Sequence, residues 1–363
     1  MTKTVLVIGA GIWGLASAYA CAKAGHRVSV LEAGKIGQGA SGGIVGAMAP
    51  HTPDNWNPKK AFQFDALASA AAYWREIDAK ANIQSGYGRI GRIQPLLSER
   101  QRNLAQSRIA SARQNWGADF QWSLADCPPY LSPEAAPFGV IHDTLSARIF
   151  PARATQALAQ ACVVSGVDIR ENNPVTSIAN RQAETPSQTF TTDTMILAAG
   201  VAGFDLLTPY LGKTPGSGVK GQAALLAADL QNQPQIYADG IYIIPHANGT
   251  TAIGSTSENT YTDATKTDRQ LDDLIAKARN LCPPLANASV LQSWAGVRPK
   301  ALRRDPMLGP IPGLPNTFAA LGAFKIGFGL AHKVGALMAD YASGTPVDLP
   351  TSFTVEHHLE HRP

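Results

Sequence analysis

The chain is short of charged residues and of cysteines. Charged side chains make up 16% of its 363 residues, and the basic ones behind the net charge of +4 are scattered along the sequence. A nucleic-acid-binding chain concentrates its basic residues in a patch or stripe, so nucleic acid is not an expected partner. Cys21, Cys127, Cys162 and Cys282 show no C-x-x-C spacing. We therefore expect reduced thiols, neither a disulfide framework nor a metal site.

Long apolar runs are also missing. No uninterrupted apolar run approaches the roughly 18 residues that a membrane-spanning helix requires. The first expected strand starts at Thr4, which leaves no room for a signal peptide. These absences predict a cytoplasmic protein with no membrane span. The length and the hydrophobic content of 45% allow two domains or one elaborated α/β domain.

The most informative segment lies at the start of the chain. An apolar run at 4–8 leads directly into G-A-G-I-W-G at 9–14, and a helical stretch follows. This order is that of a strand–helix unit with the G-x-G-x-x-G fingerprint of dinucleotide sites. Gly9 permits the tight turn, Gly11 the approach of a pyrophosphate, and Gly14 the packing of helix on strand. An ordinary glycine-rich turn is the alternative.

An acidic residue strengthens the dinucleotide interpretation. The second apolar run ends on Glu32, 18 residues after Gly14. A carboxylate there can accept hydrogen bonds from a ribose 2′-hydroxyl, which argues against the 2′-phosphate of NADP.

Further parts of the same sheet are expected far along the chain. Residues 194–200 and 318–322 each have the pattern of a strand that ends on small residues, where an α/β sheet meets its ligand. Residues 34–50 are rich in glycine and alanine and predict an ordered loop beside a flat ligand. Helices are predicted at 61–79, 99–116, 151–166 and 329–343, and an antiparallel meander at 222–227, 235–238, 241–245 and 250–255.

In this order the motifs resemble the D-amino-acid oxidase superfamily of flavoproteins, which holds glycine oxidase, sarcosine oxidase and D-amino-acid oxidase. The resemblance covers most of the chain. It is carried by residues 9–14 with Glu32, and by 40–50, 174–178, 196–200, 220–222, 242–245, 294–299 and 322–327.

The resemblance implies an α/β fold class, with a Rossmann-like FAD-binding domain and a second, antiparallel-sheet domain for the substrate. The FAD-binding domain would be discontinuous. It would comprise residues 1–50, 140–210 and 300–363, and the substrate-binding domain residues 51–139 and 211–299.

The resemblance also implies where FAD would lie. The fingerprint would hold the pyrophosphate, Glu32 the adenosine ribose and Val175 the adenine, while the 40–48 loop and the backbone of 326–329 would face the isoalloxazine ring. No cysteine matches the position that anchors FAD covalently in sarcosine oxidases, so we expect non-covalent FAD. The cofactor-binding residues expected are Gly9, Gly11, Ile12, Trp13, Gly14, Glu32, Ala40, Ser41, Gly46, Ala47, Met48, Val175, Ala199, Gly200, Gly322, Ile326, Gly327, Phe328 and Gly329.

Three side chains are candidates for the substrate site. Flavin-dependent amine oxidation needs orientation of the substrate more than a protein base, and hence a fixed cation for a carboxylate. Arg298 lies between Trp294 and Pro299 and could hold a carboxylate in two parallel hydrogen bonds. A buried structural ion pair is the alternative. Tyr242 could add a hydrogen bond or belong to the core, and Lys325 could contact a second acidic group or be solvated.

The resemblance predicts an enzyme, an FAD-dependent oxidase or dehydrogenase of glycine or of small D- or N-methyl amino acids. Its partners would be the amino acid and O2 or another electron acceptor, and it could form a homo-oligomer. Three alternatives remain open. The chain also resembles the oxidase half of a bifunctional tRNA wobble-uridine modification enzyme, it could be a non-catalytic flavoprotein subunit, and an NAD-dependent dehydrogenase would explain the fingerprint but not the residues at 322–329.

Overall fold

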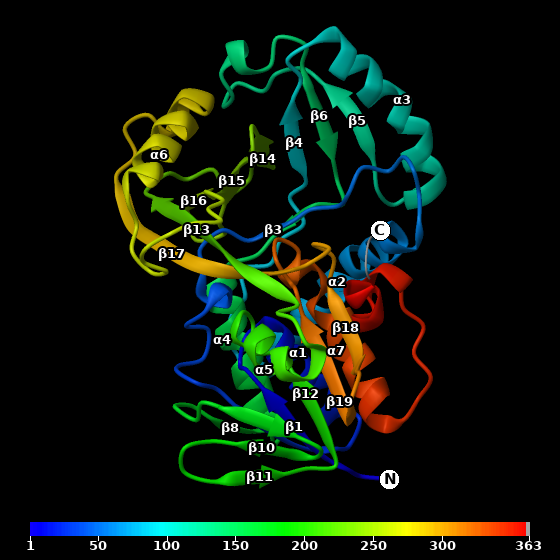
Figure 1. The fold of residues 1–363 in the computed structure, drawn as a ribbon. Coiled ribbons are helices and arrows are strands. Elements are labelled where there is room, and N and C mark those ends of the chain that lie inside the picture. The colour runs from blue at the N-terminus through cyan, green and yellow to red at the C-terminus, as the bar shows by residue number, and fades with distance from the viewer. Residues whose placement is uncertain (361–363) are drawn as a thin grey trace.

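The computed structural model describes residues 1–360 as two large sheets joined by a layer of helices. In Figure 1 one sheet lies in the lower half with the N-terminus, and the other fills the upper half, flanked by α3 and α6. The helices are α1 (Ile12–Lys23), α2 (Pro58–Ala81), α3 (Glu99–Trp116), α4 (Pro151–Val164), α5 (Ala202–Leu211), α6 (Arg269–Leu281), α7 (Gly327–Ser343) and α8 (Val355–Leu359).

The first sheet is parallel except at one edge and is assembled from distant segments. Its order is β18-β19-β12-β1-β2-β8, and only β18 is antiparallel to its neighbour. The strands are β1 (Thr4–Ile8), β2 (Arg27–Leu31), β8 (Asp168–Arg170), β12 (Thr194–Leu197), β18 (Met307–Ile311) and β19 (Leu314–Leu321). The strands predicted from the fingerprint, from 194–200 and from 318–322 are therefore neighbours, as the sequence indicated.

The second sheet has eight strands and is antiparallel except where β14 meets β4. Its order is β17-β13-β16-β15-β14-β4-β6-β5, so the predicted meander is its middle part. The strands are β4 (Arg92–Pro95), β5 (Trp122–Ala125), β6 (Val140–Asp143), β13 (Gly216–Leu226), β14 (Gln235–Ala238), β15 (Ile241–Pro245), β16 (Thr251–Gly254) and β17 (Val290–Ala301). This mixed α/β architecture confirms the predicted fold class.

Two small sheets complete the strand inventory of the described residues. β3 (Ala47–Met48) pairs with β7 (Ala147–Arg148), which ties the glycine-rich loop to the segment before α4. The other consists of β9 (Ser177–Ala179), β10 (Gln182–Glu184) and β11 (Thr189–Thr191).

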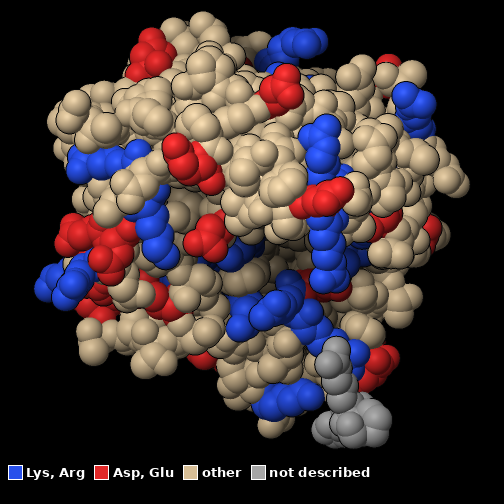
Figure 2. Space-filling view, turned by 90° about the horizontal axis from the view of Figure 1, so that it is seen from above, with Lys and Arg blue, Asp and Glu red and all other residues tan. Residues whose placement is uncertain are grey.

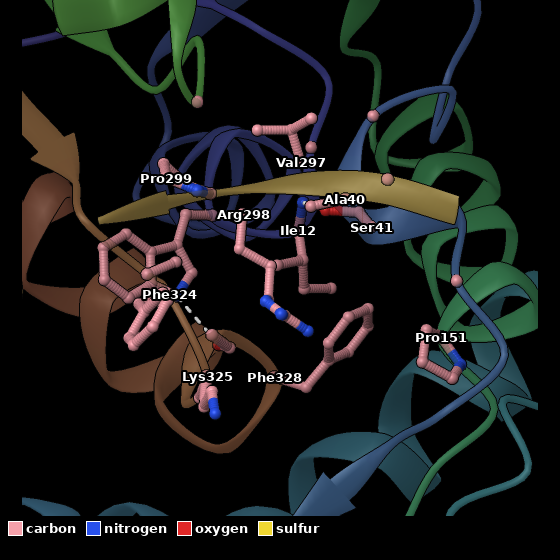
Figure 3. Close-up of a pocket in the computed structure, with 18 of the residues that line it drawn as sticks. Ile12, Ala40, Ser41, Pro151, Val297, Arg298, Pro299, Phe324, Lys325 and Phe328 are labelled. Carbon is pink, nitrogen blue, oxygen red and sulfur yellow. Dashed lines mark hydrogen bonds between the residues drawn. The ribbon is translucent and has the colours of Figure 1, made fainter. Parts of the chain in front are cut away.

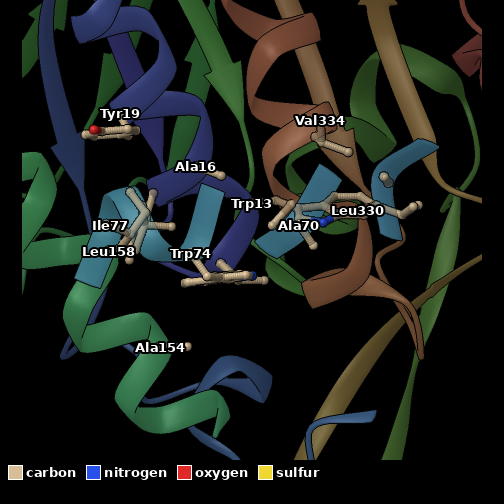
Figure 4. Close-up of a cluster of buried hydrophobic side chains, with 14 of the residues drawn as sticks. Trp13, Ala16, Tyr19, Ala70, Trp74, Ile77, Ala154, Leu158, Leu330 and Val334 are labelled. Atoms are coloured by element: carbon tan, nitrogen blue, oxygen red, sulfur yellow. The ribbon is translucent and has the colours of Figure 1, made fainter. Parts of the chain in front are cut away.

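The largest hydrophobic core lies among α1, α2, α4 and α7. Figure 4 shows Trp13 and Leu330 from the facing helices α1 and α7, with Trp74 of α2 beside them. The predicted domain boundary at residue 50 assigns α2 to the substrate-binding domain, yet α2 packs against α4 and α7. The proposed division of the chain into two domains remains a prediction.

Close contact between α1 and α7 requires a glycine. A Cβ on Gly335 would lie 2.5 Å from the carbonyl oxygen of Ala16, which belongs to the facing backbone and cannot easily move aside. Helix propensity alone would favour alanine by about 1 kcal/mol, whereas overfilling a packed contact costs about 1–3 kcal/mol.

We expect Gly335→Ala to lower the free energy of unfolding by up to about 2 kcal/mol, because the steric cost of about 1–3 kcal/mol exceeds the gain of about 1 kcal/mol in helix propensity. Chemical denaturation measures this change. Ala336→Leu, which enlarges an exposed residue on the same helix, is the control and should leave stability nearly unchanged. Stabilisation by Gly335→Ala would contradict the close packing of these helices.

Candidate active site

A cavity of about 630 Å³ runs between the two large sheets. One wall consists of the carboxyl ends of β1, β2, β12 and β19, with Gly9, Glu32, Ala199 and Gly322. The opposite wall is formed by residues of β13, β15 and β17. Carboxyl ends of parallel strands are where open α/β sheets bind their ligands.

Two of the three fingerprint glycines, Gly9 and Gly14, occupy positions that admit no side chain. Gly9 has a φ of +102°, and a Cβ there would lie 2.6 Å from the Ala198 carbonyl oxygen. A Cβ on Gly14 would lie 1.9 Å from the carbonyl oxygen of Gly9. Gly14 does not line the cavity. Its lack of a side chain instead allows α1 to start directly against the turn. Gly11 does line the cavity.

The N-terminus of α1 faces the cavity. The first backbone hydrogen bond of the helix runs from Leu15 N–H to the Gly11 carbonyl, so the preceding N–H groups have no partner within the helix. The Ile12 N–H donates to the Ser41 hydroxyl at 2.9 Å. The positive end of the helix dipole and these N–H groups suit a pyrophosphate.

Glu32 lies at one end of the cavity and is held by backbone donors. Its two carboxylate oxygens accept hydrogen bonds from the N–H groups of Ala10, at 2.7 Å, and of Gly34, at 3.0 Å. Val175 lines the same cavity. The carboxylate is therefore fixed beside the fingerprint turn, in the position expected of a ribose ligand.

The glycine-rich loop is bound tightly between its neighbours. A Cβ on Gly46 would lie 2.0 Å from the carbonyl oxygen of Ile149, and a Cβ on Gly43 would meet the Trp294 ring at 3.3 Å. The N-terminus of α7, with Phe328, faces the cavity as well. A second positive helix end here would stabilise negative charge on a reduced flavin.

Eighteen of the nineteen cofactor-binding residues expected from the sequence line this one cavity, Gly14 being the exception. The three expected substrate-site residues, Arg298, Tyr242 and Lys325, line it too. Their individual roles in holding cofactor or substrate remain predictions. Among residues 1–360 no group of three or more His, Cys, Asp or Glu side chains could hold a metal ion.

Arg298 extends from β17 into the cavity, near Phe328 (Figure 3). Its Nη1 donates to the Ser255 hydroxyl at 2.7 Å. Its Nη2 donates to the carbonyl oxygens of Lys220, at 3.2 Å, and Thr256, at 2.8 Å. No carboxylate lies within salt-bridge distance of Arg298 in the described chain, so the alternative of a buried structural ion pair is not what the structure shows.

Burial lowers the pKa of Arg298, while the nearby Glu258 opposes that shift. Arginine keeps its charge even after such a shift, because the ordinary pKa of a guanidinium lies far above neutral pH. Arg298 is therefore a fixed cation in a partly desolvated wall. Sequence reasoning missed Ser255 and Thr256, since both are brought to Arg298 only by the pairing of distant strands.

Tyr242 packs against Tyr237, with ring centroids 4.5 Å apart. Burial raises the pKa of Tyr242, and the nearby Arg92 opposes this rise. Arg92 forms a buried ion pair with Asp143 at 2.9 Å and has one Nη at 3.5 Å from the Tyr242 hydroxyl. The neutral phenol is therefore retained, with its oxygen near a buried cation.

Lys325 is exposed at the rim of the cavity. In Figure 3 its side chain is directed away from the Arg298 guanidinium. Partial burial and then the charges of Arg298 and Arg304 lower the pKa of Lys325. Together with Arg298 it makes this end of the cavity cationic, whereas Glu32 is the charged residue at the other end.

These features are those of a protein that binds a dinucleotide cofactor in a cavity with one cationic end. Residues 4–341 match the family described as DAO, FAD dependent oxidoreductase. The chain belongs to this family, and it is an FAD-dependent oxidoreductase. The resemblance inferred from the sequence is thereby confirmed.

Similarity to glycine oxidases supports the same class of enzyme, an FAD-dependent oxidoreductase. The chain is 29% identical to glycine oxidase of Pseudomonas aeruginosa, over 95% of this chain and 96% of the relative. It is 28% identical to glycine oxidase of Bacillus licheniformis, over 94% and 93%. The crystal structure of glycine oxidase from Geobacillus kaustophilus superposes with a TM-score of 0.87 at 24% identity, covering 98% of both chains, which shows a shared fold. The relatives support FAD-dependent amino-acid oxidation as the class of reaction.

The residues of the cavity fit FAD. Gly9 and Gly11 leave the backbone bare at the phosphate end, α1 presents its N-terminal N–H groups there, and Glu32 offers a fixed carboxylate. Small residues of the 40–48 loop and the N-terminus of α7 line the remainder, which suits a flat ring system.

Among residues 1–360 no helix is both long and apolar enough to cross a membrane.

The fingerprint assignment can be tested at Gly11. A Cβ there would lie 3.3 Å from the Ser41 hydroxyl, and the two γ-carbons of valine would occupy the approach to the α1 N-terminus. The φ of Gly11 is −77°, which valine can adopt. We expect Gly11→Val to purify with little or no flavin, measured by visible absorbance, and with a far-UV circular dichroism spectrum like that of the parent. A folded variant with full flavin content would contradict the assignment.

Proposed function

We propose that the protein oxidises a small amino acid, either glycine, a D-amino acid or an N-methyl amino acid. The observation that carries this proposal is the fixed Arg298 cation in a wall of the cavity that also contains Trp294, Tyr242 and Phe328. Within the described chain, the charged residues that line the cavity are Glu32, Arg298 and Lys325. The end remote from Glu32 therefore attracts an anion, as a substrate carboxylate would require.

The chain contributes orientation rather than acid–base chemistry. Arg298 would bind the carboxylate and so fix the α-carbon, and the aromatic residues would exclude water from it. FAD, which the fingerprint turn, Glu32 and the 40–48 loop would hold, would supply the acceptor for the two electrons of the substrate C–H bond. The substrate becomes an imine, which water hydrolyses to a 2-oxo acid and ammonia or an amine. Hydrogen peroxide forms as well if O2 is the electron acceptor.

An anaerobic titration tests this proposal. The purified holoprotein would be mixed with glycine, sarcosine, proline and a panel of D- and L-amino acids while the visible flavin band is recorded. We expect one class of small amino acid to bleach the band, and readmission of air distinguishes an oxidase from a dehydrogenase by the rate of recovery. A flavin that none of them reduces would contradict the proposal and favour a larger substrate, such as modified tRNA, or a non-catalytic subunit.

The carboxylate role of Arg298 gives a separate prediction. Lysine is a compact point donor and cannot keep the three contacts of the guanidinium while also binding the substrate. We expect Arg298→Lys to raise KM by about 10- to 100-fold, corresponding to the loss of a charge-assisted hydrogen bond. Steady-state kinetics with the best amino acid measures this change. Lys333→Arg, which alters a cation outside the cavity, is the control. An unchanged KM would remove Arg298 from the substrate site.

A further inference from the structure

Ser255 carries a hydroxyl in the cavity whose proton has no acceptor in the described chain. The residue follows β16 directly and lines the cavity. Its Oγ accepts a hydrogen bond from Arg298 Nη1 at 2.7 Å, and this is the only hydrogen bond of its side chain within residues 1–360. A serine hydroxyl has one donor and two acceptor positions. The O–H group therefore remains available to a ligand beside Arg298.

The hydrogen bonds of Arg298 restrict how it can bind a carboxylate. Both N–H groups of Nη2 are taken by the Lys220 and Thr256 carbonyls, and one N–H of Nη1 by Ser255. Within residues 1–360, Nε is buried without a hydrogen-bond partner. Each edge on which a guanidinium offers two parallel N–H groups includes Nη2. The parallel pair of bonds expected from the sequence is thus not free, and a carboxylate needs a second donor from another residue.

We infer that Ser255 is that second donor, a substrate-binding residue that the sequence analysis did not identify. The inference rests on the proposed function, in that the ligand is the carboxylate of an amino acid. One carboxylate oxygen accepts from Arg298 Nη1, and the other accepts the Ser255 O–H. The Arg298–Ser255 hydrogen bond orients the hydroxyl, because its lone pair must face Nη1 and its proton then points elsewhere.

Gly221 on β13 makes room for this arrangement. A Cβ at Gly221 would lie 2.3 Å from Nη1, 2.5 Å from Nη2 and 2.6 Å from Cζ of Arg298. The guanidinium therefore lies directly over the Gly221 backbone, within reach of both carbonyls and of Ser255. Gly221 is a positioning residue, because it acts on the substrate only through Arg298.

A buried polar network fixes the backbone that holds Arg298. Gln222 donates to Glu258 at 3.0 Å and to Asp268 at 2.9 Å. Lys220 lies 3.7 Å from each of these two carboxylates. Lys220, Gln222 and Glu258 are each at least 93% buried, so solvent screens the hydrogen bonds and charge interactions among them only weakly. The Lys220 carbonyl itself accepts a hydrogen bond from the Glu258 N–H at 2.9 Å, which holds it beside Nη2.

The test measures carboxylate binding directly. Acetate would be titrated into the oxidised holoprotein, and its Kd read from the perturbation of the visible flavin spectrum. We expect Ser255→Ala to weaken acetate binding by about 10- to 100-fold, the size expected for a hydrogen bond to a charged group. Ser255→Thr keeps the hydroxyl and should bind within about threefold of the parent, on the same scale. Ser257→Ala, an exposed serine outside the cavity lining, is the matched control and should not change Kd.

A second pair of variants tests the placement of Arg298. Gly221→Ala should weaken acetate binding at least as much as Ser255→Ala, because it displaces the guanidinium. Gly218→Ala, on the same strand, would place a Cβ against Val297 and Tyr261 rather than Arg298, and should retain acetate affinity. Flavin content and thermal unfolding of each variant separate local effects from misfolding. With an amino-acid substrate, both Ser255→Ala and Gly221→Ala should raise KM more than they lower kcat.

The outcomes separate this inference from the proposed function. Acetate binding by Ser255→Ala equal to that of the parent would overturn the inference, as would a parent that binds no acetate or an equal loss in Ser257→Ala. A parent that binds acetate through Ser255 yet is reduced by no amino acid would overturn the proposed function and leave the carboxylate site standing. If an amino acid reduces the parent but Ser255→Ala has an unchanged KM, the inference about Ser255 would be overturned and the proposed function would stand.

Discussion

The structure depends on the contact between the β1–α1 turn and the strands around it. Gly9 and Gly14 meet so closely that a Cβ on Gly14 would lie 1.9 Å from the Gly9 carbonyl oxygen. This contact places the N-terminus of α1 at the carboxyl edge of the first sheet, where Glu32 is bound by the Ala10 N–H. The same helix packs along its length on α7, whose own N-terminus then reaches the cavity. Two positive helix ends are thereby directed at one ligand site.

A second constraint acts on the opposite wall, where a cation must be held in a partly desolvated place. Burial of an arginine is tolerable only if its N–H groups find acceptors. The pairing of β13 with β17 provides the Lys220 carbonyl, and the segment after β16 provides Ser255 and the Thr256 carbonyl. Because these acceptors are two carbonyls and a hydroxyl, all of them neutral, the wall keeps its positive charge for a ligand. Arg298 is thus buried with most of its N–H groups hydrogen-bonded, and its charge remains available to a ligand.

The sequence predicted what is encoded locally. The fingerprint, the strand ends at 194–200 and 318–322, and α2, α3, α4 and α7 are each marked by spacing within a short window. Strands β4, β5 and β6 escaped prediction because each has only four residues and joins the sheet through distant pairing, as Arg92 of β4 pairs with Gln235, 143 positions later (235 − 92). Ser255 escaped for the same reason. It lies 43 residues from Arg298, and the register of three strands brings the two together.

The separation of charge along the cavity follows from the placement of Glu32 by the first sheet and of Arg298 by the second. Glu32 is placed by the parallel sheet and Arg298 by the antiparallel one, so the two charges face opposite ends of one continuous space. In the view of Figure 2 basic and acidic side chains are interleaved over the surface, whereas inside the cavity they are separated. Because the charges are separated, the two ends of the elongated cavity differ, one being acidic and the other basic. We propose that Glu32 would orient the ribose end of the cofactor and that Arg298 would orient an anionic substrate at the other end. Under the proposed function, the first sheet would recognise the cofactor and the second the substrate, and the two would meet in the cavity between the sheets.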